Sequence, residues 1–399
     1  MPPPPTHREL ARVVRDHAGR LAASLVHLVG DFTTAEDLVA DAVEAALTHW
    51  PVDGIPDRPD AWLYTVARRR GLDHLRRAHR HRRRLALAPV PPEPAPDDRL
   101  RLIFTCCHPA LPRTAQVALT LRVVCGLTTA QIAKAFLVPE STVGQRVTRA
   151  KRKINQAGIP YRIPAADELG DRLTEVLAVV YLLFNEGYLA TDGSRVWSRD
   201  LTDDAEFLAA LLHNLMPTEP EAAGLLALIR LHRARAAARF GADGELIQLP
   251  HQDRSRWDRA AIADAGRLIA RAAARGRPGP YQLQAAIVAC HAEAARWEDT
   301  DWPQILVLYD MLVRLAPSPV TRLHRAVALR YVAGPAAALG EVDALAAELD
   351  GYHLLHATRA ELLRDLGDAD AARAADERAL ARTANPAERS LLRRRLAWT

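Results

Sequence analysis

Alanine, leucine and arginine recur at spacings of three and four residues along almost the whole chain. This period matches the 3.6 residues of a helical turn, so it separates an apolar face from a polar face in one segment after another. A sustained alternation of apolar and polar residues, which marks a half-buried strand, is missing from the sequence. The sequence therefore predicts an all-α protein.

Two interruptions divide this helical pattern into parts. Residues 85–98 read LALAPVPPEPAPDD, and the five prolines predict an extended, semi-rigid linker of roughly 40 Å. At Gly158 the run GIPYRIP predicts the end of a long basic helix. We therefore predict a helical domain over residues 6–84, a linker over 85–98, a second domain over 99–158 and a larger helical domain over 165–399.

Composition and charge narrow the possible functions. Apolar residues make up 49% of the chain and charged residues 25%, as is usual for a folded globular protein. The four cysteines are few, and the N-terminal run lacks the apolar core of a signal peptide, so we expect a cytoplasmic protein without a membrane partner. The first 160 residues hold 24 lysines and arginines against 15 acidic residues, whereas the whole chain carries only +5. A polyanionic partner is therefore expected for this N-terminal part alone.

The most specific motif spans residues 126–154 and reads GLTTAQIAKAFLVPESTVGQRVTRAKRKI. Thr128 and Gln131 are spaced as a capping box, which predicts the start of a short helix, and Pro139 suits the start of a second helix. The predicted buried stripe of the second helix consists of Val143, Val147, Ala150 and Ile154. The motif is a predicted helix-turn-helix.

The opposite face of the second helix is typical of a recognition helix in the DNA major groove. Short hydrogen-bonding side chains lie near its start and cations lie further along, which suits contacts with base edges and phosphates. The predicted DNA contacts are Ser141, Thr142, Gln145, Arg146, Arg149 and Lys153. A solvated basic face is the alternative, but no acidic residue interrupts the run after Glu140, and this favours DNA binding.

A second basic segment precedes the linker and reads AWLYTVARRRGLDHLRRAHRHRRR. Asp60 is its predicted N-cap, and Trp62 shares one helical stripe with Arg69 and Arg76. An aromatic ring beside guanidinium groups suits an opened DNA strand, because exposed bases can stack on a side chain while the phosphates are neutralised. The alternative is that Trp62 belongs to the core and the arginines are solvated, and the segment alone does not separate these interpretations.

An acidic stripe lies nearer the N-terminus. Thr33 and Glu36 are spaced as another capping box, and the helix that they start carries Asp37, Asp41 and Glu44 at i, i+4 and i+7. A solvated face is the simplest interpretation of the stripe. On an otherwise basic domain, however, such a patch could dock a basic protein surface.

The C-terminal part contains a weak repeat from about residue 280. Thr300, Gly334 and Gly367 mark predicted turns at spacings of 34 and 33 residues, close to the tetratricopeptide (TPR) period. In the last unit Ala360 and Ala372 place small residues where two helices of a hairpin would cross. This part is therefore predicted to be TPR-like, with a possible protein partner, because stacked helical pairs form grooved binding surfaces.

Catalytic and metal-binding patterns are weak. Cys106, Cys107 and His108 are consecutive, whereas a structural zinc site usually draws on separated pairs of ligands. The runs FNEGYLATDG (184–193) and HQDRSRWD (251–258) lack a phosphate loop, a nucleophile elbow and metal-ligand spacing, so polar packing is their expected use. We expect no enzyme activity, no metal and no cofactor.

Taken in order, the acidic helix, the Trp/Arg segment, the linker and the helix-turn-helix resemble bacterial RNA polymerase sigma factors of the extracytoplasmic-function (ECF) type. The runs AEDLVADAVEAAL and GIPDRPDAWLYTVARRRGLDHLRR resemble sigma region 2, and residues 126–154 resemble region 4. Members of the family commonly carry ARN in region 2, where this chain has Arg69 at the third place. The remainder resembles the long C-terminal extension of one subgroup.

The resemblance implies a role for each surface. Asp37, Asp41 and Glu44 would contact core RNA polymerase, and residues 57–77 would melt and hold the −10 element of promoter DNA. The implied contacts with the melted −10 strand are Trp62, Arg68, Arg69, Arg76 and Arg77. The helix-turn-helix would read the −35 duplex, and the C-terminal extension would regulate the protein or contact polymerase. Such a subunit has no catalytic residue of its own.

Two alternatives come from other classes of protein. A one-component helix-turn-helix regulator with a helical ligand-sensing domain would explain residues 126–154 and the large C-terminal part, but it leaves the two N-terminal surfaces without a role. An enzyme in the C-terminal part is the other alternative, although the sequence shows no site for one.

Overall fold

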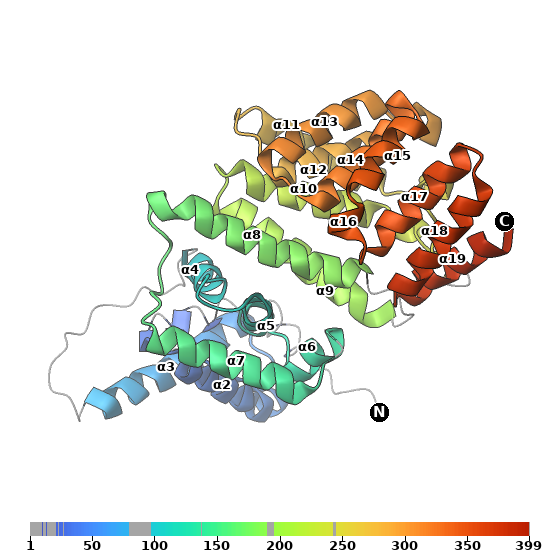
Figure 1. Cartoon of the computed structure of the whole chain (residues 1–399). Helices are drawn as coiled ribbons and strands as arrows, with labels where there is room; N and C mark the ends of the chain where they lie inside the picture. The colour runs from blue at the N-terminus through green and yellow to red at the C-terminus, as the bar shows by residue number, and fades with distance from the viewer. Residues whose placement is uncertain are drawn as a thin grey trace. The chain divides into compact units, whose positions relative to one another are not determined.

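The computed structural model describes residues 10, 13, 21, 22, 24–26, 28–79, 97–136, 138–189, 195–241 and 245–398. Within these residues the chain is built from helices, and its one β-bridge joins Phe240 to Leu246 (Figure 1). The predicted all-α class is confirmed. None of the helices in the described part has the length and apolar character needed to cross a bilayer.

The chain divides into two compact units, residues 1–186 and residues 187–399. The helices that begin in the first unit are α2 (Phe32–Asp53), α3 (Pro59–His79), α4 (Asp97–Cys106), α5 (Arg113–Val123), α6 (Thr129–Ala135), α7 (Glu140–Gln156) and α8 (Ala166–Leu189). The predicted linker lies outside the described residues except for its last two positions, which begin α4. The predicted domain boundaries stay predictions.

Helices α2 and α3 form an antiparallel pair at the start of the first unit. Gly71 of α3 makes their close approach possible, because a Cβ there would lie 3.1 Å from the side chains of Leu28 and Leu38. Two predicted helix starts are wrong. Asp31, and not the pair of Thr33 and Glu36, caps α2, since its carboxylate accepts a hydrogen bond from the backbone N–H of Thr34 at 2.7 Å.

Asp60 is likewise not the N-cap of α3. The helix already begins at Pro59, which places Asp60 in its first turn. Proline suits this first helical position because its missing N–H would have no partner within the helix. In both cases another residue that can start a helix lies one or two positions away. Spacing in the sequence did not decide which of the two residues starts the helix.

The helix-turn-helix forms as predicted. The backbone N–H of Thr128 donates to Gln131 Oε1 at 2.7 Å, and the N–H of Gln131 donates to Thr128 Oγ1 at 3.1 Å, so the capping box is confirmed. Helix α7 begins directly after Pro139 and ends before Gly158, whose φ is +60°. The four residues of the predicted stripe, Val143, Val147, Ala150 and Ile154, are all buried.

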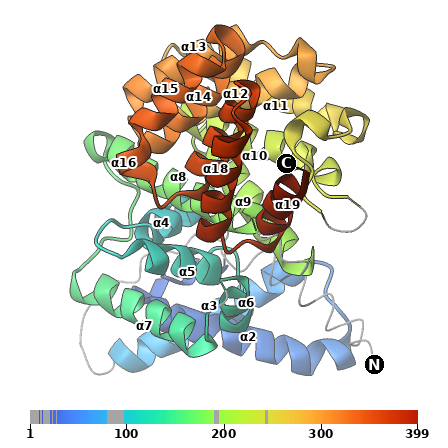
Figure 2. The same ribbon diagram turned by 45° about the vertical axis from the view of Figure 1, so that its right-hand side comes forward.

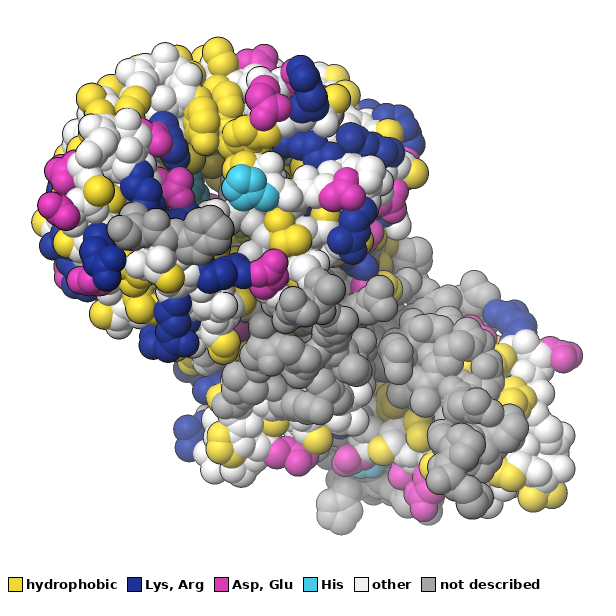
Figure 3. All heavy atoms as spheres, turned by 90° about the vertical axis from the view of Figure 1, so that its right-hand side faces the viewer, with side chains coloured by type: hydrophobic (Ala, Val, Ile, Leu, Met, Phe, Trp, Pro, Cys, Tyr) yellow, Lys and Arg dark blue, Asp and Glu magenta, His cyan; other side chains and the backbone are white. Residues whose placement is uncertain are grey.

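The second unit consists of stacked helical pairs. Its helices are α9 (Arg195–Leu215), α10 (Pro220–Ala234), α11 (Arg259–Ala273), α12 (Pro280–Glu293), α13 (Trp302–Leu315), α14 (Pro319–Ala333), α15 (Pro335–Ala344), α16 (Ala346–Leu349), α17 (His353–Asp365), α18 (Ala369–Arg382) and α19 (Pro386–Trp398). Short 3-10 helices η1 (Ala236–Ala238), η2 (Leu249–His251), η3 (Arg254–Arg256) and η4 (Trp297–Asp299) connect some of them. On the face of this unit that Figure 3 shows, basic, acidic and hydrophobic side chains are interspersed.

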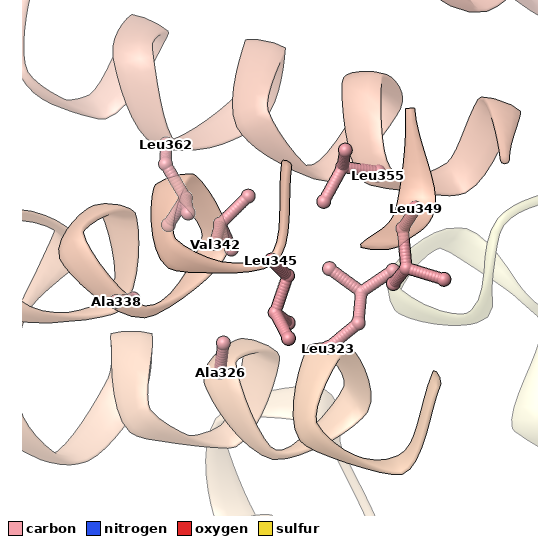
Figure 4. Close-up of a cluster of buried hydrophobic side chains, with 8 residues drawn as sticks. All are labelled: Leu323, Ala326, Ala338, Val342, Leu345, Leu349, Leu355 and Leu362. Carbon is pink, nitrogen blue, oxygen red and sulfur yellow. The ribbon is translucent and has the colours of Figure 1, made fainter. Parts of the chain in front are cut away.

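The predicted repeat turns are where the sequence indicated. Gly334 and Gly367 join α14 to α15 and α17 to α18 with φ of +87° and +82°, values that favour glycine. Thr300 lies two residues before the start of α13, between η4 and the N-cap Asp301. The repeats share an apolar core, in which leucines of α14, α17 and the α15–α16 segment point toward one another (Figure 4).

Candidate nucleic-acid interface

The outward face of α7 carries the side chains predicted to contact DNA. Ser141, Gln145, Arg149 and Lys153 are exposed. Thr142 and Arg146 are partly exposed on the flank of the same face. Among the described residues no carboxylate forms an ion pair with Arg149, Arg146 or Lys153. The face therefore presents cations that no carboxylate of the described residues neutralises, together with short polar groups at the N-terminal end of the helix.

The angle between the two helices of the motif is held by a polar contact. Thr129 Oγ1, at the start of α6, donates to Glu140 Oε1 at 2.8 Å, at the start of α7. The carboxylate of Glu140 also lies at the positive end of the α7 dipole, where negative charge is stabilised. The contact keeps the first turn of α7 in place relative to α6.

The inward face of α7 meets α2. Lys151 is 9% exposed and forms an ion pair with Glu36, which also lies 4.0 Å from Arg122 Nε. One turn further along, Asn155 Nδ2 donates to Asp31 Oδ1 at 2.9 Å. Both views show α7 beside the α2–α3 pair (Figures 1 and 2). We call these contacts the α2–α7 latch.

The latch also explains the electrostatics of the α2 N-cap. Burial by itself would raise the pKa of the Asp31 carboxyl. The hydrogen bonds from Thr34 and Asn155 outweigh burial and hold the pKa below its ordinary value. Asp31 is therefore ionised near neutral pH and accepts from both helices.

The predicted acidic stripe lies on the exposed side of α2, and one of its members has a partner. Asp37 and Glu44 are exposed. Asp41 is half-exposed and lies 3.3 Å from Arg70 Nη1 of α3. Two of the three carboxylates are thus presented to solvent, whereas the third also braces the α2–α3 pair.

Trp62 is tied to the core of the α2–α3 pair. Its ring packs edge-on against Trp50 with centroids 5.7 Å apart, and Trp50 is only 2% exposed. His49 approaches the same ring at 6.4 Å. Trp62 is only partly buried, so a packing contact and partial exposure are combined in this residue.

The arginines of α3 differ in their surroundings. Arg69 is exposed, and Arg68 is partly buried with an Nε that has no partner. Arg76 is exposed and lies 3.3 Å from Asp73 Oδ1. The side chain of Arg77 lies outside the described residues. Because a helix rises 1.5 Å per residue, Trp62 and Arg76 are roughly 21 Å apart along α3.

Sequence reasoning missed Lys151 and its partner. The signal was available on one side, since Lys151 follows Val147 by four residues and precedes Ile154 by three, and so belongs to the buried stripe. Its partner Glu36 is 115 residues away along the chain. Helical spacing gives no information about such a pairing.

In the run HQDRSRWD (251–258) two carboxylates hold local backbone turns, whereas the run FNEGYLATDG (184–193) lies partly outside the described residues. Asp253 accepts from the N–H of Ser255 at 2.9 Å, and Asp258 accepts from the N–H of Ala261 at 3.0 Å as the N-cap of α11. Cys106 and Cys107 are buried, and burial raises the pKa of the Cys107 thiol to about 11. Across the part of the chain that the structure describes, no group of three possible metal ligands occurs.

Comparison with known families places three matches along the chain. Residues 13–81 match Sigma-70 region 2, residues 101–154 match Sigma-70, region 4, and residues 172–273 match a family of unknown function, DUF6596. The region 2 match contains α2 and α3, and the region 4 match contains α5, α6 and all but the last two residues of α7. No solved structure matches the chain.

Two relatives extend this picture. An uncharacterized protein of Rhizobium meliloti is 44% identical over 387 residues, covering 94% of this chain and 92% of the relative. The probable ECF RNA polymerase sigma factor SigI of Mycobacterium tuberculosis is 30% identical over 173 residues, covering 40% of this chain and 59% of SigI. Both sigma regions are thus present in order and SigI is among the relatives, so the comparisons support the resemblance of this chain to RNA polymerase sigma factors of the ECF type.

Proposed function

We propose that the chain is an alternative sigma factor that binds core RNA polymerase, recognises −35 and −10 promoter elements and directs transcription initiation. The observation that carries this proposal is the outward face of α7. Its cations have no carboxylate partner among the described residues, and its buried stripe fixes which side faces outward. Such a face is suited to the −35 duplex.

Region 2 would act on the −10 element. Opening DNA costs about 1–2 kcal/mol per stacked step, so the protein must bind the separated strand more tightly than the duplex. Exposed Arg69 and Arg76 would neutralise phosphates, and the accessible part of Trp62 would contact a base. The packing of Trp62 on Trp50 supports this role, because a fixed ring loses little entropy on stacking.

The exposed acids of α2 would meet core polymerase. Asp37 and Glu44 are accessible carboxylates on a domain that is otherwise basic, and complementary charge steers association. Asp41 would contribute less than its neighbours because it is partly neutralised by Arg70. We assign the C-terminal unit a regulatory or polymerase-contacting role, and we assign the chain no catalytic role.

Transcription of fragmented genomic DNA by purified core polymerase tests the proposal. With the full chain added, sequencing should reveal transcripts that core alone does not make and that share −35 and −10 sequences. Arg149→Ala should reduce them, whereas Arg267→Ala, which removes an exposed arginine of α11, should not.

Association with core polymerase separates the sigma factor from the one-component regulator. A sigma factor should co-purify with core in the absence of DNA. A chain that binds duplex DNA, fails to bind core and starts no transcript would overturn the proposal in favour of the regulator.

A further inference from the structure

A cluster of four arginines, two of them buried, lies in the second unit, where η1, η3 and the start of α11 meet. Arg235 and Arg254 are 7% and 9% exposed. Their guanidinium carbons lie 6.0 Å and 4.5 Å from the centre of the same ring, that of buried Trp257. Half-buried Arg239 follows η1, and exposed Arg259 begins α11. We call these four arginines the arginine cluster.

The cluster contains no ion pair. None of the four arginines pairs with a carboxylate in the described ranges of the chain. Arg254 Nη1 donates instead to the backbone oxygens of His291 and Ala294, at 2.6 Å and 2.7 Å. Arg259 Nη1 donates to the backbone oxygen of Ala292 at 3.1 Å. Buried cations are usually paired with acids, so this set of neutral partners is unusual.

The other two arginines contact aromatic groups. Arg235 Nη2 lies 2.9 Å from His232 Nδ1 and 3.5 Å from the Tyr188 hydroxyl. Arg239 donates to the backbone oxygen of Tyr188 at 3.0 Å, and its guanidinium lies 3.5 Å from the centre of that ring. These contacts orient the guanidinium groups without neutralising their charge.

The acids nearest to the cluster do not complete it. Glu298 and Asp299 are close enough to raise the pKa of Arg254, but burial and the neighbouring Arg259 and Arg235 outweigh them, so the pKa is lowered. Asp299 instead accepts from exposed Arg296 at 2.8 Å. The positive charge of the cluster is therefore not compensated by a carboxylate within it.

The histidines of the cluster do not add charge near neutral pH. Burial, followed by the charges of Arg235 and Arg254, lowers the pKa of His291 to about 4. Burial, followed by Arg235 and Arg239, places the pKa of His232 well below its ordinary value. The charge to be balanced is thus that of the guanidinium groups.

Four hydrogen-bonding atoms in the cluster are buried and have no partner among the residues that the structure describes. They are Arg235 Nε, Arg254 Nη2, Trp257 Nε1 and His291 Nδ1. Three of these atoms are obligatory donors, and His291 can donate from one ring nitrogen when it is neutral. Burying such a donor without an acceptor is costly, so these four atoms mark the cluster as a place where a bound acceptor would be stabilised.

We propose that the arginine cluster binds a phosphate-bearing small molecule. Guanidinium forks match phosphate oxygens in pairs, and a dianion offsets more of the buried charge than a carboxylate would. A small molecule fits better than a nucleic acid, because the unpartnered atoms are buried and a polymer backbone would need an open groove. The site is separate from the surfaces assigned to DNA and polymerase.

Aromatic groups next to the cluster suggest how the rest of the ligand is held. His291 stacks on Trp297 with centroids 5.8 Å apart and planes inclined by 5°. Trp302 stacks in turn on Tyr331, which is 40% exposed, at 3.9 Å. This aromatic series runs from the buried cluster to the surface, so a planar ring attached to the phosphate could stack there.

Thermal unfolding of the full chain with added phosphate tests the site. Inorganic phosphate at a tenfold excess over its Kd should raise the Tm of the second unit by about 3–6 °C over chloride of equal ionic strength. A parallel titration with AMP tests whether a planar ring attached to the phosphate stacks on the aromatic groups. Tighter binding of AMP than of phosphate would support stacking, and equal binding would limit the site to the phosphate group.

Substitutions locate the effect. Arg235→Gln should abolish the phosphate-dependent rise in Tm, whereas Arg267→Gln, at an exposed arginine paired with Asp264, should keep it. If Arg235→Gln does not fold, Trp257→Phe provides a milder test, since it removes only the Nε1 donor and should weaken binding severalfold. No rise with phosphate in the wild type, or the same rise in all variants, would overturn the proposal.

Discussion

Breaking the α2–α7 latch should release region 4 from region 2. The −35 and −10 elements are separated by roughly 85 Å of duplex at 3.4 Å per base pair, so one compact unit cannot bind both. If the proposed function holds, α7 must leave α2 before the promoter is bound. Glu36→Gln is the most direct perturbation, because Glu36 faces both Lys151 and Arg122.

The burial of the pair sets the size of the effect. The side chains of Lys151 and Glu36 are 11% and 26% exposed. Removing one partner of a fully buried pair costs about 3–5 kcal/mol, and a surface pair contributes about 0–1 kcal/mol. Glu36→Gln leaves Lys151 buried without a carboxylate, so we expect a cost of about 2 kcal/mol to the docked state. That cost corresponds to about a 30-fold rise in the ratio of open to docked molecules.

Substitution of the other partner, Lys151, should destabilise the docked state less. Lys151→Met leaves Glu36 near Arg122, at 4.0 Å, and it places an apolar side chain in an apolar stripe. We expect about 0–1 kcal/mol for this variant. The difference between the costs of the two substitutions is a sharper test than either cost alone. It arises because Glu36 has a second cation, Arg122, beside it.

Spin labels on the two helices would measure the opening. Thr48 of α2 and Arg152 of α7 are both exposed and suitable for cysteine substitution and labelling, with Cys290→Ser to remove a partly exposed thiol. The wild type should give a narrow distribution of label distances, and Glu36→Gln a second, broad component. Asp37→Asn, at the next position but exposed, is the matched control. A Glu36→Gln distribution identical to that of Asp37→Asn would refute the latch.

Three further predictions concern other surfaces. Arg149→Ala should weaken binding to the −35 duplex by about 1–3 kcal/mol in a titration, and an equal loss on scrambled DNA would show that Arg149 contacts only phosphates. The double variant Asp37→Lys and Glu44→Lys should bind core polymerase at least tenfold more weakly, while its circular dichroism spectrum stays helical. Asp41 is left unchanged because it pairs with Arg70. Normal binding of the double variant to core polymerase would refute the docking role. The free energy of unfolding should fall as pH decreases from about 6.5 toward 4, because His291 binds its proton less readily in the folded state than in the unfolded chain. The free energies of unfolding from urea titrations at pH 7.5 and pH 5 should differ by roughly 2 kcal/mol because of His291, and His291→Gln should reduce this difference. A free energy of unfolding that does not change with pH would contradict the prediction.

Local spacing gave the correct face of α7 but not every helix start. Val147 and Ile154 repeat at intervals that only a helix brings onto one side, so burial of that side followed directly. Helix starts depend on a single capping group, and neighbouring candidates compete. Asp31 caps α2 because its carboxylate reaches the N–H of Thr34, a choice that spacing between Thr33 and Glu36 did not reveal.

Contacts between distant segments were decided by tertiary structure alone. Glu36 and Lys151 are 115 residues apart, and Arg235 and Arg254 come from different elements that meet at Trp257. The sequence by itself determined the helical class, the two polar faces of the N-terminal part and the turns of the repeats, because each depends on neighbours within a few residues. Which buried charges find partners depends on how whole helices pack, and only the folded chain shows that the latch is paired while the arginine cluster is not.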